Sequence, residues 1–72
     1  MPKMTQKDRI RKYLDDFGSI TWLDAAADIG VARLAARISE MIRAGEPIIA
    51  DMETGKNRYG ETTRYARYRR AV

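Results

Sequence analysis

The sequence of 72 residues contains no cysteine and no histidine. The absence of cysteine excludes disulfide bonds and thiolate metal ligands, and the absence of histidine removes the commonest general base and the commonest metal ligand. The sequence also has no glycine-rich phosphate loop and no nucleophile beside an evident base. We therefore expect no enzymatic activity, no catalytic residue, no metal site, no cofactor and no small-molecule substrate.

No apolar run reaches the length that spans a membrane, and the N-terminus shows no signal peptide. We therefore expect a cytoplasmic protein without a membrane partner. A chain of this length forms one domain and buries only about 60% of the surface of its unfolded form. We expect residues 1–72 to form this single domain, with its core within about 5–70 and with modest stability.

Two short helical segments separated by a glycine occupy the centre of the sequence, from Thr21 to Gly45. Thr21 can cap the first segment, and Asp24 three residues later resembles the acidic member of a capping box. Gly30 interrupts the pattern, as a turn between two helices requires. In the second segment the apolar stripe at helical spacing consists of Leu34, Ala35, Ile38, Met41 and Ile42. The other side of this predicted helix carries Arg33, Ala36, Arg37, Glu40 and Arg43.

Before this region we expect a helix from Gln6 to Phe17 that ends at Gly18. Its predicted buried face consists of Ile10, Tyr13, Leu14 and Phe17. Ser19–Ile20 is expected to pair as a very short strand with a later hairpin, with Ile20 directed into the core. In the next helix the apolar set is Trp22, Leu23, Ala26 and Ile29, and we expect Trp22 in the core.

The last third of the sequence predicts a hairpin. Ile48, Ala50 and Met52 alternate with Ile49, Asp51 and Glu53, so one face is apolar and the other more polar, which is typical of a half-buried strand. Residues 53–62 contain two glycines and an asparagine and are expected to form a loop or the end of a hairpin. In the return strand 63–70 we expect Ala66 and Tyr68 to face the core, although Tyr65 competes with Tyr68 for that side.

Basic residues are concentrated near the C-terminus. The net charge is +4, and residues 53–72 contain six basic side chains against only Glu53 and Glu61. The rest of the sequence is balanced between acidic and basic residues. Basicity gathered in one segment indicates a polyanionic partner, while a solvated strand surface with a basic tail is the alternative interpretation.

The predicted order is helix, strand, helix, helix, strand, strand, which is an α+β arrangement with a C-terminal hairpin. The chain resembles the small bacterial and phage winged helix-turn-helix proteins. The segments that carry the resemblance are GSIT at 18–21, LAARISEMIRAGEPI at 34–48 and ARYR at 66–69. The resemblance covers about residues 5–70 and implies three helices, a β-hairpin wing and binding of double-stranded DNA, as in a phage or prophage regulator or accessory factor.

If this resemblance extends to DNA binding, the helix within 34–43 enters the major groove. Arg33 and Arg37 are one turn apart, and each arginine can donate two hydrogen bonds to guanine, a contact that discriminates by about 1–3 kcal/mol. Ala36 between them can contact a thymine methyl group. Arg43 is better placed for a phosphate. Glu40 either accepts from cytosine or pairs with Arg37 or Arg43.

Lys56, Asn57 and Arg58 are expected at the tip of the hairpin, within reach of phosphates or of a minor groove. For Asn57 the alternative is a role in the turn itself, and for the two cations it is solubility. The sequence leaves two other binding functions open. One is a protein-interaction domain that forms a homodimer or binds an acidic partner, in which Asp24 and Asp28 could meet a basic wing of another copy. The other is binding of single-stranded nucleic acid, with Tyr59, Tyr65 and Tyr68 as stacking groups.

Overall fold

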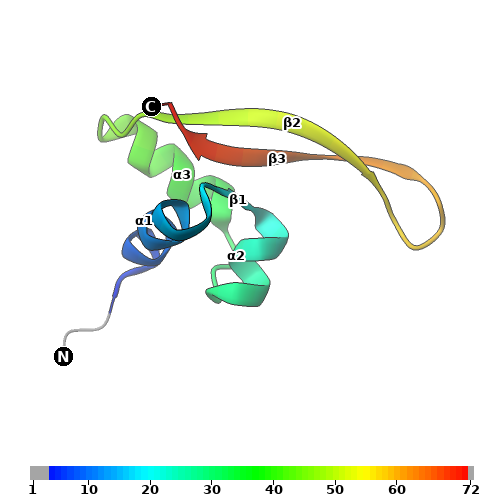
Figure 1. The fold of residues 1–72 in the computed structure, drawn as a ribbon, viewed down its shortest axis with the longest axis horizontal. Helices are drawn as coiled ribbons and strands as arrows, with labels where there is room; N and C mark the ends of the chain where they lie inside the picture. Colours follow the sequence, from blue (N-terminus) through cyan, green and yellow to red (C-terminus); the bar gives the residue numbers. More distant parts are fainter. Residues whose placement is uncertain (1–3, 72) are drawn as a thin grey trace.

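The computed structural model describes residues 4–71 and contains, in this range, three helices and one antiparallel sheet (Figure 1). The elements are α1 (Gln6–Phe17), β1 (Ser19–Thr21), α2 (Trp22–Asp28), α3 (Leu34–Arg43), β2 (Ile48–Lys56) and β3 (Thr62–Arg70). The strands lie in the order β1-β3-β2. The predicted α+β order is therefore confirmed. No helix in the described part of the chain is long and apolar enough to cross a membrane.

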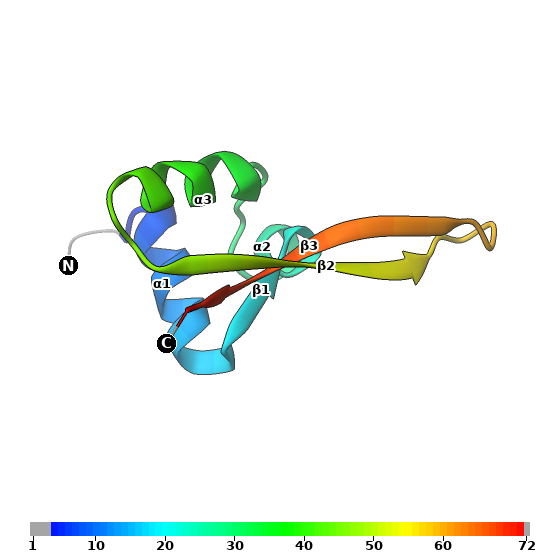
Figure 2. The same cartoon turned by 90° about the horizontal axis from the view of Figure 1, so that it is seen from above.

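Residues at each end of α1 determine where this helix begins and ends. The Thr5 hydroxyl accepts a hydrogen bond from the backbone of Asp8 at 3.1 Å, and the Asp8 carboxylate accepts one from the Thr5 backbone at 3.2 Å. Gly18 ends the helix in the left-handed conformation, with φ of 85°. Phe17 was predicted to be buried, but 69% of it is exposed. Figure 2 shows that the end of α1 is farther from α3 than its beginning, so the last turn has less of the body to pack against.

Strand β1 leads directly into α2. It pairs antiparallel with β3, with Ile20 opposite Tyr68, and Ile20 is fully buried, as predicted. The predicted capping box at the start of α2 is also confirmed, because Thr21 and Asp24 exchange hydrogen bonds of 3.0 and 3.3 Å.

The apolar face predicted for α2 is wrong in part. Trp22 and Leu23 are 59% and 58% exposed, and Ala26 is exposed as well. The buried residue of α2 is Ala25, and Ile29 just after the helix packs against the core. The methyl side chain of Ala25 lets this short helix lie close to the core, and the indole of Trp22 lies outside the core.

Helix α3 buries a narrower stripe than predicted. Leu34, Ile38 and Met41 are buried, whereas Ala35 and Ile42 are exposed. In a helix with 3.6 residues per turn, positions 35 and 42 lie on one flank of the buried stripe. Within residues 4–71 the neighbouring helix α1 packs on the other flank, where Lys7 forms an ion pair with Glu40. The flank with Ile42 therefore stays exposed.

The hydrophobic core lies in the helical part of the molecule. Its buried residues come from the three helices, β1 and the turn before α3: Ile10, Tyr13, Leu14, Ile20, Ala25, Val31, Leu34, Ile38 and Met41. From the long hairpin only Ile48 and Tyr68 pack against this cluster within the described residues. The part of the hairpin that extends beyond the helices therefore adds no residue to the core.

Strands β2 and β3 form a long wing. They pair from Ile48 opposite Arg70 to Lys56 opposite Thr62, so β2 continues through residues 53–56, which were predicted to be a loop or the end of a hairpin. These polar residues adopt strand conformation because each has a partner in β3. The wing extends beyond the helices (Figures 1 and 2). Ala50 and Met52, expected on a half-buried face, are consequently exposed.

Candidate nucleic-acid interface

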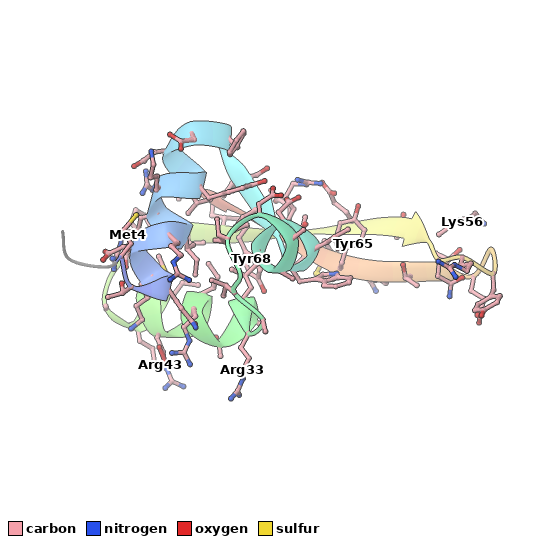
Figure 3. The ribbon with its side chains drawn as sticks, turned by 90° about the horizontal axis from the view of Figure 1, so that it is seen from below. Met4, Arg33, Arg43, Lys56, Tyr65 and Tyr68 are labelled. Carbon is pink, nitrogen blue, oxygen red and sulfur yellow. The ribbon has the colours of Figure 1, made fainter. Side chains whose placement is uncertain are left out.

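Helix α3 presents one arginine near each end. Arg33 lies directly before the helix and Arg43 is its last residue. Both side chains are exposed, neither has a carboxylate partner within residues 4–71, and they extend from the same side of α3 (Figure 3). Between them the exposed residues of α3 are Ala35, Ser39 and Ile42. This side of α3 is therefore a surface of small and apolar groups with a cation at each end.

Arg37 and Glu40 were predicted on the side of α3 opposite its apolar stripe, and in the structure both are only partly exposed. Arg37 forms an ion pair with Glu40 at 3.5 Å, and Glu40 also pairs with Lys7 of α1 at 3.2 Å. Only 32% of the Arg37 side chain is exposed, and its buried Nε has no hydrogen-bond partner among the described residues. Ala36 is half-buried on the same side. The pairing expected for Glu40 is thus present, and base contacts by Arg37 stay a prediction.

The tip of the wing is built around Asn57. Its Oδ1 accepts hydrogen bonds from the backbone of Tyr59 at 2.9 Å and of Glu61 at 3.0 Å. Gly60 completes the turn, because it donates to the Asn57 carbonyl and has φ of 79°, a conformation that glycine adopts without strain. The amide of Asn57 therefore has the structural role that was the alternative to DNA contact. Arg58 and Tyr59 remain exposed at the tip.

The basic C-terminal residues form ion pairs at the base of the wing. Arg67 pairs with Glu53 at 3.0 Å and lies 3.9 Å from Asp24. The hydrogen bond that Arg67 donates to Glu53 is the main cause that raises the pKa of Arg67. Arg69 pairs with Asp51 at 2.6 Å, and Arg70 pairs with Asp15 of α1. The basicity counted in the sequence is thus locally compensated in this part of the wing.

Ion pairs also occupy most cations of α1. Arg11 bonds to Glu46 and Asp8, and Lys12 pairs with Asp16. Arg9 is half-buried and donates to the carbonyl of Ile29 at 3.3 Å. Within residues 4–71 the exposed cations without a carboxylate partner are Arg33, Arg43, Lys56, Arg58 and Arg64. All five belong to α3, the residue before it, or the wing.

Two helices joined by a short turn, followed by a paired hairpin, define this fold. A family model described as a winged helix-turn-helix domain matches residues 5–71 of the chain. The chain belongs to this family. Winged helix-turn-helix domains are in general DNA-binding and not catalytic, so the family indicates the class of partner. A search of curated proteins and a search of solved structures gave no match.

The acidic pair and the tyrosines, which the sequence suggested as other binding surfaces, are placed differently in this winged helix-turn-helix domain. Asp24 caps α2, and Asp28 accepts a hydrogen bond from Tyr13, so both carboxylates of the acidic pair have internal partners. Tyr68 packs on the core while Tyr59 lies at the far tip of the wing. The three tyrosines expected as stacking groups therefore do not form one platform.

Proposed function

We propose that this domain binds duplex DNA with α3 in the major groove and with the wing against the adjacent backbone, as a phage or prophage transcriptional regulator or accessory factor. The observation that supports the proposal is the distribution of the exposed, uncompensated cations over α3 and the wing alone. A cation that is already paired with a carboxylate contributes little to the attraction of phosphates, whereas an unpaired one contributes fully.

The dimensions of α3 suit this role. A helix of 10 residues is about 15 Å long, and the major groove is about 12 Å wide. With α3 in the groove, Arg33 at its N-terminal end is assigned to a guanine edge and Arg43 at its C-terminal end to a phosphate. The small side chains of Ala35, Ala36 and Ser39 allow the helix backbone to approach the bases closely, and an alanine methyl can contact thymine.

On the wing, Arg58 is the cation that we assign to the DNA backbone. It lies in the turn at the tip and has no carboxylate partner among the described residues. Lys56 also lies at the far end of the wing. Its side chain does not point to the side of the molecule on which Arg33 and Arg43 project (Figure 3). One domain of this size makes few base contacts. Useful specificity then requires a dimer, tandem copies or a partner protein.

The test is the salt dependence of binding to a short random-sequence duplex. Each phosphate contact that is lost reduces the slope of log affinity against log salt by about one, so Arg43→Ala and Arg58→Ala are each expected to lower the slope by about this amount. Arg33→Ala is expected to weaken binding to a preferred site by about 1–3 kcal/mol.

The matched control is Arg69→Ala, because Arg69 is paired with Asp51. This variant is expected to keep the slope of the unmodified protein. A slope that falls equally in the Arg69 variant, or that stays constant in the Arg43 and Arg58 variants, would contradict the assigned interface.

A further inference from the structure

An exposed apolar pair lies outside the proposed DNA interface. Trp22 and Leu23, in the first turn of α2, are 59% and 58% exposed. They line a groove of about 620 Å³ between α2 and the wing. Adjacent large apolar side chains in a concave surface are typical of a site for a protein partner.

An aromatic ring forms another part of this groove. Tyr65 of β3 is a lining residue, and a Cβ atom at Gly55 on β2 would lie 3.3 Å from its Cε1 atom. Glycine at this strand position therefore makes room for the ring to lie against β2. Figure 3 shows Tyr65 where the wing leaves the helical part of the molecule.

The groove also borders an unpaired strand edge. Strand β1 ends at Thr21, opposite Arg67 of β3. From Thr62 to Ala66, β3 therefore has no strand partner on this side within the described part of the chain. Backbone groups at such an edge can pair with an added strand from another chain.

The charge of the groove favours an acidic occupant. Lys56 and Arg64 line it and have no carboxylate partner within residues 4–71. The carboxylate that lines the groove belongs to Asp24. It already accepts a hydrogen bond from the Thr21 backbone, and its Oδ2 lies 3.9 Å from Nη1 of Arg67. The uncompensated charge along the groove is therefore positive.

We propose that this groove binds an extended acidic segment of a partner protein. The segment adds as a strand to the free edge of β3, places apolar side chains on Trp22, Leu23 and Tyr65, and directs carboxylates to Lys56 and Arg64. Of these residues, Lys56 was also a candidate for DNA contact, and Lys56 and Arg64 are both among the uncompensated cations that support DNA binding. The site stands on its own, whether or not α3 binds DNA.

The experiment is a selection of random peptides, about eight residues long to exceed a typical strand, on the immobilised full chain. Peptides that also bind the Trp22→Ser variant are removed in a counter-selection. Trp22 is exposed, so this substitution leaves the core intact. We expect the remaining peptides to be enriched in aspartate or glutamate alternating with apolar residues.

One enriched peptide is then titrated while tryptophan emission is recorded, which reports this groove alone because Trp22 is the only tryptophan. A saturable shift of the emission to shorter wavelength is expected. Arg64→Glu is expected to weaken the binding about tenfold or more. Phe17→Ser is the matched control, since Phe17 is an exposed aromatic residue that does not line this groove, and it is expected to bind as the unmodified chain does.

Several results would overturn the proposal. These are the absence of enriched peptides, enrichment without acidic residues, and equal binding by the Arg64→Glu variant. A saturable emission shift with a single-stranded oligonucleotide but with none of the selected peptides would assign the groove to nucleic acid instead. An emission shift that follows protein concentration without peptide would assign it to a second copy of the chain.

Discussion

The phenol of Tyr13 on α1 donates a hydrogen bond of 2.7 Å to the carboxylate of Asp28, the last residue of α2. This bond joins the first helix to the helix that precedes the turn of the helix-turn-helix. The hydrogen bond is the main cause that raises the pKa of Tyr13 to about 12, and burial raises it further. The neutral phenol is therefore part of what holds α2 in place.

The pH dependence of stability follows from this bond. The stabilisation is fully present below the ordinary tyrosine pKa of 10.0 and is lost as the pH rises through about 12. We expect Tyr13→Phe to lower the thermal midpoint at pH 7 and to reduce the loss of stability above pH 10. Thermal unfolding of both proteins across this pH range tests the expectation. Parallel loss in the two proteins would contradict it.

A second prediction concerns acid. Arg11 donates hydrogen bonds of 2.9 and 2.8 Å to the two carboxylate oxygens of Glu46, and this contact lowers the pKa of Glu46 below its ordinary 4.5. The stabilisation is present above 4.5 and is lost as the pH falls through the lower folded value. We expect Glu46→Gln to lower the free energy of unfolding by less than about 1 kcal/mol at neutral pH, with a difference that disappears in acid.

Denaturant unfolding at several pH values measures this difference. Asp16→Asn, which removes an exposed ion pair on α1 with Lys12, serves as the control. It is expected to change stability less than Glu46→Gln does. If Asp16→Asn has the larger effect, the prediction is contradicted, because the Arg11–Glu46 pair would then contribute less to stability than the Lys12–Asp16 pair.

A third prediction separates the two flanks of α3. Ile38 is buried, while Ile42 one turn later is 47% exposed. Ile38→Ala is expected to cost about 2–5 kcal/mol because it leaves a cavity in the core. Ile42→Ala should stay within about 0.5 kcal/mol. Equilibrium unfolding of the two variants tests the orientation of the helix, and equal losses would mean that Ile42 belongs to the core.

The turn of the wing gives a fourth prediction. Asn57→Ala removes the hydrogen bonds that the Asn57 side chain accepts from Tyr59 and Glu61. Because the tip has no buried residue, we expect faster amide hydrogen exchange in residues 56–62 and an unchanged global unfolding midpoint. A lower midpoint would show that the tip is coupled to the core.

Local features of the sequence predict the helices well. The bounds of α1 and the capping box of Thr21 and Asp24 depend on contacts within a few residues, and the structure confirms both. The pairing of β1 with the hairpin joins distant parts of the sequence and is also confirmed, with Ile20 buried as predicted.

Other features depend on packing that a sequence pattern does not contain. A helical wheel places Arg37 on one flank of the α3 stripe and Ile42 on the other, but only the position of α1 decides which flank is covered. The length of β2 depends on its partners in β3. The compensation of Arg67 and Arg69 depends on strand register, which places Glu53 and Asp51 diagonally opposite them.

The separation of core and wing has a consequence for how such a domain diversifies. Every fully buried residue of the described chain precedes residue 42, so the distal wing contributes no core packing. Substitutions there change the surface offered to a partner at little cost to folding. Related domains can therefore exchange one binding preference for another through the wing, while the helical part keeps a constant set of packed side chains.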